Sequence, residues 1–174
     1  LETENYLGEV DFLRAKALFA LAMLAIVPEL SKKPMIDWRA AYPHVLLLNF
    51  RRQGKTVVPL TISLTNSAAS NSPSERPIGG TPSNNRILVI SGPNAGGKSV
   101  CLKTVAMLQY MLQCGLPVPM SEASTMGFFK QLLIDIGDEQ SIEDDLSTYS
   151  SHLRNMKHFV RYANAHTLLL IDEF

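Results

Sequence analysis

The feature that most constrains the fold is a glycine-rich string at residues 92–99, which reads GPNAGGKS. It matches the pattern G-x-x-x-x-G-K-[ST], follows the apolar run 86–91 (RILVIS) and precedes helical apolar spacing over about 97–114. A strand, a glycine-rich turn and a helix in that order direct backbone N–H groups and the positive helix end toward one point. The string predicts a phosphate-binding loop; the alternative is a glycine-rich turn in an unrelated α/β fold.

Within this loop the residue types indicate their roles. Lys98 is expected to hold the β- and γ-phosphates of a nucleotide and to act in catalysis, and the Ser99 hydroxyl is expected to bind Mg²⁺. The predicted nucleotide-binding residues run from the first glycine into the first turn of the helix: Gly92, Pro93, Asn94, Ala95, Gly96, Gly97, Lys98, Ser99 and Val100.

A second half of the site is predicted at residues 167–173, where the apolar strand TLLLI ends in Asp172 and Glu173. Ligands of open α/β sheets bind at the carboxyl ends of the strands. We expect Asp172 to hold Mg²⁺ through water and Glu173 to deprotonate an attacking water, which favours hydrolysis over phosphoryl transfer. Taken alone, such a strand end is more often merely solvated; the upstream loop favours the functional interpretation.

The rest of the pattern predicts an α/β fold with a mostly parallel sheet, flanking helices and an N-terminal antiparallel strand pair. That pair is predicted as a hairpin of strands 44–50 and 56–63. The remaining expected elements are an amphipathic helix over 4–27, a mobile loop over 65–85, a strand over 127–136 and a helix over 148–163.

Composition excludes several classes of protein. The chain has 174 residues, enough for one core, and its sixteen basic residues balance sixteen acidic ones. It therefore lacks the overall charge that nucleic acid or an anionic membrane surface attracts. The uncharged apolar run 17–27 is well short of the roughly 20 residues of a membrane span, so no membrane partner is expected. Two cysteines and no secretory pattern favour the cytoplasm.

Several residues have a plain structural interpretation. The four histidines lack the spacing of a zinc site, and for His152 and His158 solvent exposure is the simplest expectation. Met107, Leu108 and Met111 follow helical spacing and are expected in the core.

The strings SGPNAGGKSVCLKTV, DIGDEQSIEDDLSTYSSHL and LLLIDEF together resemble the ATPase domain of the MutS family, which is close to the ABC-type ATPases. They occur in the order of that family and cover about residues 86–174. The run after Ala95 and the string at 147–153 look more like the recombination-suppressing second branch than the mismatch-repair branch.

This resemblance implies a P-loop NTPase of ABC-like type that binds ATP and Mg²⁺ and acts as a homodimer with composite sites. Ser147 and Thr148 match the signature position and would contact the γ-phosphate held by the partner, although the same residues could simply cap a helix. Gln140 matches a region that senses the metal or the attacking water.

The resemblance also suggests a domain organisation. Residues 1–40 are expected to be the end of a helical arm and a linker. Residues 41–174 are expected to be the N-terminal part of the ATPase domain, cut after the Asp-Glu strand. DNA would be contacted by parts of a longer protein, and this chain alone would hydrolyse ATP weakly or not at all.

The predicted function is that of a Mg-ATP switch in a DNA-binding protein of mismatch repair or recombination control. Two alternatives stay open. One is an ABC- or SMC-like ATPase head, although those families use LSGGQ-like glycines where this chain reads LSTYSSH. The other is a non-catalytic DNA clamp module that retains a nucleotide pocket.

Overall fold

The structure is a computed structural model that describes residues 2–65, 86–93, 97–136 and 145–172, with the side chains of 2, 48, 51–52 and 145–149 left out. The helices are α1 (Glu2–Met23), α2 (His44–Arg52), α3 (Lys98–Gln113) and α4 (Asp145–Tyr162). The strands are β1 (Glu29–Ser31), β2 (Ile36–Ala41), β3 (Leu60–Leu64), β4 (Thr125–Gly127), β5 (Gln131–Asp135) and β6 (Thr167–Ile171).

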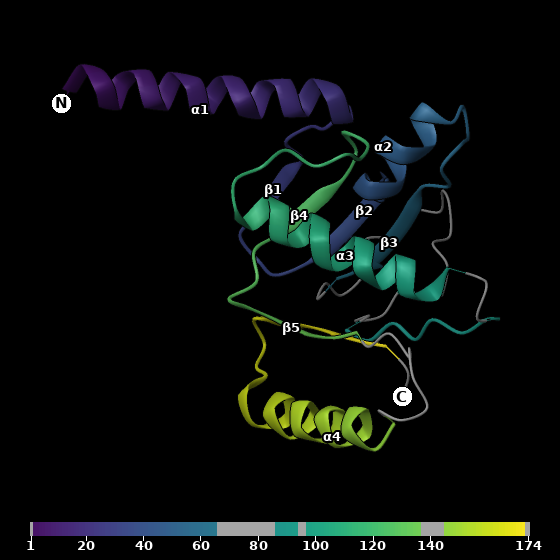
Figure 1. Cartoon of the computed structure of the whole chain (residues 1–174). Helices are drawn as coiled ribbons and strands as arrows, with labels where there is room; N and C mark the ends of the chain where they lie inside the picture. Colours follow the sequence, from purple (N-terminus) through teal and green to yellow (C-terminus); the bar gives the residue numbers. More distant parts are fainter. Residues whose placement is uncertain (1, 66–85, 94–96, 137–144, 173–174) are drawn as a thin grey trace.

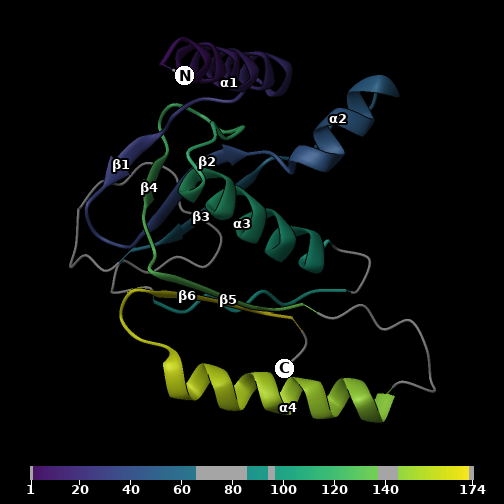
Figure 2. The ribbon, with the colours of Figure 1, turned by 60° about the vertical axis from the view of Figure 1, so that its left-hand side comes forward.

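These elements form a layered α/β arrangement around helix α3. A four-stranded sheet has the order β1-β4-β2-β3, in which β1 and β4 are parallel and the other neighbours are antiparallel. Strands β5 and β6 form a separate parallel pair. Figures 1 and 2 show α3 between the two sheets and α4 on the outer side of the β5–β6 pair. The described residues thus form two small sheets rather than the single, mostly parallel sheet expected.

The core follows from this layering, because α3 is apolar toward both sheets. Trp38 of β2 and Leu108 of α3 are fully buried, and Leu170 of β6 belongs to the same cluster. Met111 is buried as expected, whereas Met107 is 42% exposed because it lines a surface cavity described below. The prediction that Met107 belongs to the core was therefore wrong.

Residues 44–50 form helix α2, so the predicted strand there was wrong. The Leu47 amide donates to the Pro43 carbonyl at 2.9 Å, an i to i−4 bond that begins the helix. A short leucine-rich run fits a buried strand and a helix equally well by pattern, and leucine favours the helix. An antiparallel N-terminal pair does form, but from β2 and β3, with an irregular register between Trp38 and Ala41.

Residues 86–91 are not a strand among the described residues, although the sequence predicted one. The segment runs beside the β5–β6 pair in Figure 2, and a cavity of about 1180 Å³ separates it from β6. Without a ladder partner two of its apolar side chains stay open to solvent, Ile87 at 83% and Val89 at 82% exposure, whereas Leu88 is half-buried against the core.

The predicted strand 127–136 forms only in part: residues 131–135 are β5, whereas Gly127 ends β4 and 128–130 lie between the two strands. Gly127 lies at the division, where a Cβ atom would overlap the backbone of Lys33 and Met35. The Gly127 amide donates to the Met35 carbonyl at 2.8 Å, so the two chain segments are packed backbone to backbone. This contact ends β4 and directs the chain toward the second sheet.

Three predicted elements are confirmed: the helix after the glycine-rich string, the helix near 148–163 and the strand 167–171. Helix α1 also forms but ends at Met23, and most of its apolar side chains, such as Leu13 and Leu21, are exposed. The boundary expected after residue 40 falls inside β2. Residues 66–85 of the predicted loop lie outside the described residues. Among the described helices, none is long and apolar enough to cross a membrane.

Candidate nucleotide site

The glycine-rich string is followed directly by α3, as the sequence predicted. Gly97 precedes the helix with φ 80° and ψ 21°, a left-handed conformation that glycine adopts without steric cost. The Cys101 amide donates to the Gly97 carbonyl at 2.9 Å, which closes the first turn. The first-turn N–H groups of the helix therefore face the loop, where an anion would be stabilised.

Lys98 reaches back across the loop. Its Nζ donates to the carbonyl oxygen of Gly92 at 2.9 Å, so the ammonium group lies beside the first residue of the glycine-rich string. Ser99 is half-buried in the first helical turn, next to Lys98. Asn94, Ala95 and Gly96 lie outside the described residues.

Asp172 follows β6, and its side chain is almost buried at 7% exposure. Its amide donates to the Asp135 carbonyl at 2.9 Å, which extends the β5–β6 pairing by one residue. Within the described part of the chain, no hydrogen bond or ion pair engages its carboxylate. Such a carboxylate is suited to a cation or to a water bound by one.

The two halves predicted from the sequence meet at one cavity. The cavity of about 1180 Å³ beside β6 is lined by Gly92 and Lys98 from the loop and by Asp172 from the strand end. These residues are more than seventy positions apart in sequence, and the parallel β5–β6 pair with α3 packed on it brings them together. The Asp172 carboxylate is an oxygen donor of the kind that Mg²⁺ prefers, so this end of the cavity fits that ion, whereas Ser99, whose hydroxyl was expected to bind it, is not among the lining residues.

Other predicted site residues are only partly described. Glu173 and Gln140 lie outside the described residues. Ser147 and Thr148 belong to the first turn of α4, which begins at Asp145, three residues before the predicted start. Among the described residues as a whole, no three His, Cys, Asp or Glu side chains gather as a metal site.

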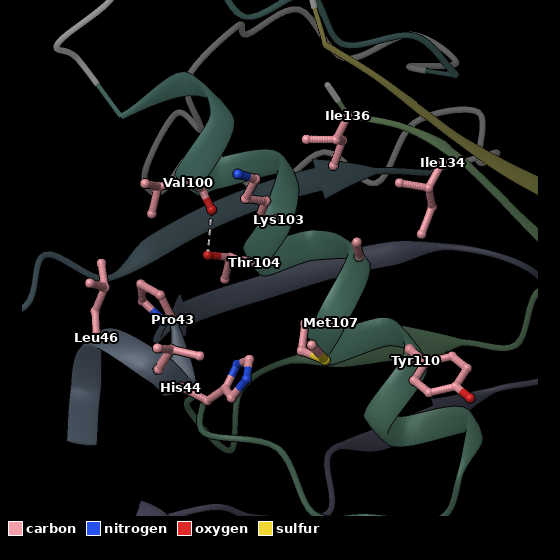
Figure 3. A pocket seen from close by; sticks show the side chains of 12 residues that line it. Pro43, His44, Leu46, Val100, Lys103, Thr104, Met107, Tyr110, Ile134 and Ile136 are labelled. Atoms are coloured by element: carbon pink, nitrogen blue, oxygen red, sulfur yellow. Dashed lines mark hydrogen bonds between the residues drawn. The ribbon is translucent and has the colours of Figure 1, made fainter. Parts of the chain in front are cut away.

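A second cavity, of about 570 Å³, lies on the other side of α3 (Figure 3). Val100, Met107 and other apolar side chains line most of it, together with Lys103 and Thr104 of α3 and His44 from the start of α2. The Thr104 hydroxyl donates to the Val100 carbonyl at 2.6 Å, so its polar end faces the helix rather than the cavity. The apolar lining and the volume fit a planar ring system.

Burial shifts the pKa of two groups near these cavities. It lowers the pKa of His44, whose Nδ1 is buried and without a hydrogen-bond partner among the described residues, so His44 is held neutral. Burial also raises the pKa of the Cys101 thiol in the first turns of α3, which keeps it protonated.

Sequence reasoning missed a polar cluster beside the site. Asp135, at the end of β5, accepts hydrogen bonds from His152 and Asn155 of α4. The expected solvent exposure of His152 was wrong, because this contact half-buries the ring. The sequence signal that could have predicted this cluster is the acid Asp135 at the end of a strand, together with His152 and Asn155, which are three positions apart and therefore on one face of a helix.

The family model described as MutS domain V matches residues 88–174, half of the chain. The chain therefore belongs to the MutS family. Within it, the chain is 40% identical over 167 residues to endonuclease MutS2 of Lactiplantibacillus plantarum, covering 96% of this chain and 18% of that protein.

Two further relatives carry the same name. The chain is 37% identical to endonuclease MutS2 of Carboxydothermus hydrogenoformans over 171 residues, which are 98% of this chain and 19% of the relative. It is 48% identical to that of Borreliella burgdorferi over 94 residues, which are 54% of this chain and 12% of the relative. These relatives support the MutS2 branch, and the chain spans about a fifth or less of their length.

Proposed function

We propose that this chain is the part of a MutS-family DNA-binding protein that binds Mg-ATP, with a P-loop fold of the ABC-like type, and that the whole protein hydrolyses ATP as a homodimer. The observation that carries this proposal is the single cavity lined by both Lys98 and Asp172. Family membership favours it over the ABC- or SMC-like alternative. The balanced charge of the chain disfavours a DNA clamp role for this part of the protein.

The residues act by binding and orienting the nucleotide. The loop N–H groups and Lys98 hold the β- and γ-phosphates, while Ser99 and Asp172 hold Mg²⁺. When bound, Mg²⁺ neutralises negative charge on the phosphates. Glu173 takes the proton of the attacking water, and Ser147 and Thr148 of one copy face the γ-phosphate bound by the partner.

The relatives are named endonucleases, and we assign no nuclease step to the residues of this chain. In the whole protein, ATP binding would join the two heads and hydrolysis would separate them. Such a cycle would connect nucleotide state to DNA binding in recombination control, the role suggested for the second branch, or in mismatch repair. The compartment we propose for it is the cytoplasm.

The test is equilibrium binding of a fluorescent ATP analogue with Mg²⁺ to the full-length protein. Lys98→Ala should abolish binding, because the ammonium contact to the phosphates is lost. Lys130→Ala is the matched control, since Lys130 is exposed at the start of β5 and lines neither cavity. Equal binding by the wild type and Lys98→Ala would refute the proposal.

A further inference from the structure

One carboxylate joins helix α4 to the strand edge that carries Asp172. Asp135 Oδ2 lies 2.7 Å from His152 Nδ1, and Asp135 Oδ1 accepts from Asn155 Nδ2 at 3.0 Å. Its side chain is only 9% exposed, so both hydrogen bonds form largely away from water. The backbone carbonyl of the same residue accepts the Asp172 amide at 2.9 Å.

Polar and apolar contacts have different roles in placing α4. Helix α4 packs on β5, and its residues Phe159, at 7% exposure, and Met156, which is half-buried, are shielded from solvent as apolar side chains. Apolar burial has little directional preference. The two hydrogen bonds to Asp135 are directional, because each engages one of its carboxylate oxygens. They therefore fix the rotation of α4 about its axis and its position along β5.

We propose that Asp135, His152 and Asn155 form a positioning clamp that sets the first turn of α4 relative to the Asp172 end of β6. This inference rests on the proposed function, in which that first turn meets the nucleotide bound by a second copy of the chain. His152 and Asp135 are positioning residues: they act on turnover through the placement of α4 and do not touch the nucleotide.

The clamp predicts a separation between nucleotide binding and turnover. The phosphate loop and α3 are held by their own contacts, such as that of Lys98 with Gly92, so losing the clamp leaves nucleotide affinity intact. The helix stays docked through Phe159, so the fold survives. The first turn of α4 then samples several orientations, and few of them complete the composite site.

The experiment uses the full-length protein and measures ATP turnover, affinity for a non-hydrolysable ATP analogue and the thermal unfolding midpoint. His152→Ala should lower kcat about tenfold or more and leave the analogue affinity and KM within about twofold. His152→Asn should restore most of the rate, because its amide nitrogen can donate from the position of Nδ1. His158→Ala is the matched control, since His158 is exposed on the same helix and stacks only on Tyr162 among described rings.

Two results would overturn the clamp. One is a kcat for His152→Ala equal to that of His158→Ala. The other is a joint loss of analogue affinity and thermal midpoint that His152→Asn does not rescue, which would indicate a merely structural contact. Lys98→Ala is measured in parallel: analogue binding equal to that of the wild type would refute the proposed function itself, which separates that failure from failure of the clamp.

Discussion

A buried glutamine connects the helix of the candidate site to the four-stranded sheet. Gln109 of α3 is 0% exposed, and its Nε2 donates to the Gly127 carbonyl at 2.8 Å and to Gln113 Oε1 at 3.1 Å. Gln113 Oε1 in turn accepts the Phe129 amide at 3.0 Å. These bonds fix α3 to the segment that connects β4 to β5.

We predict that Gln109→Leu lowers the free energy of unfolding by about 1–2 kcal/mol. A buried carbonyl that loses its donor costs about 1–3 kcal/mol. Part of this loss is offset, because Gln109 Oε1 is itself buried without a partner among the described residues, and leucine removes that unsatisfied atom. Gln109→Glu should be worse, at more than about 3 kcal/mol near neutral pH, because a buried carboxylate would face the Gly127 carbonyl.

The assay is urea unfolding of the chain, followed by the fluorescence of Trp38, its only tryptophan, which is fully buried. With ordinary urea slopes, Gln109→Leu should lower the midpoint by about 0.5–1 M. Gln53→Leu serves as the control, because Gln53 is exposed after α2. A leucine variant as stable as the wild type, or a glutamate variant as stable as the leucine one, would refute this account of the network.

Two other predictions concern the groups with shifted pKa. Burial places the folded-state pKa of His44 below its usual value of 6.5, so unfolding takes up a proton on acidification. The contribution of His44 to the free energy of unfolding is therefore present above about pH 6.5 and is lost as the pH falls below that value. In the His44→Gln variant, the free energy of unfolding measured against pH should lack this loss. Cys101 is half-buried and its pKa is raised by that burial, whereas Cys114 is exposed. A thiol reagent should therefore modify Cys114 first, and equal rates of modification at the two cysteines, resolved by mass spectrometry, would contradict this prediction.

The sequence predicted the elements whose pattern is long or strongly punctuated. Helix α3 follows a glycine-rich string, and α4 has one apolar face, so both were predictable. Residues 44–50 were misassigned because a short apolar run fits a strand and a helix alike. Residues 86–91 have the composition of a buried strand, yet a strand forms only where a neighbour supplies hydrogen bonds.

In the candidate site, too, local patterns predicted some residues and tertiary packing determined others. Lys98 and Asp172 were predictable from local patterns, because each motif carries its own chemistry within a few residues. The contact of Asp135 with His152 was not predictable in this way. It joins residues 17 positions apart through the packing of α4 on β5, which local patterns do not report.

The most direct test of the central claim, that Lys98 and Asp172 serve one nucleotide site, is the Mg²⁺ dependence of ATP binding by the full-length protein. Calorimetric titration with and without Mg²⁺ would be performed on the wild type, Lys98→Ala and Asp172→Asn. We predict that Lys98→Ala shows no binding in either condition, and that Asp172→Asn binds ATP but loses the gain in affinity that Mg²⁺ gives the wild type. An unchanged Mg²⁺ dependence in Asp172→Asn, or full binding by Lys98→Ala, would contradict the account.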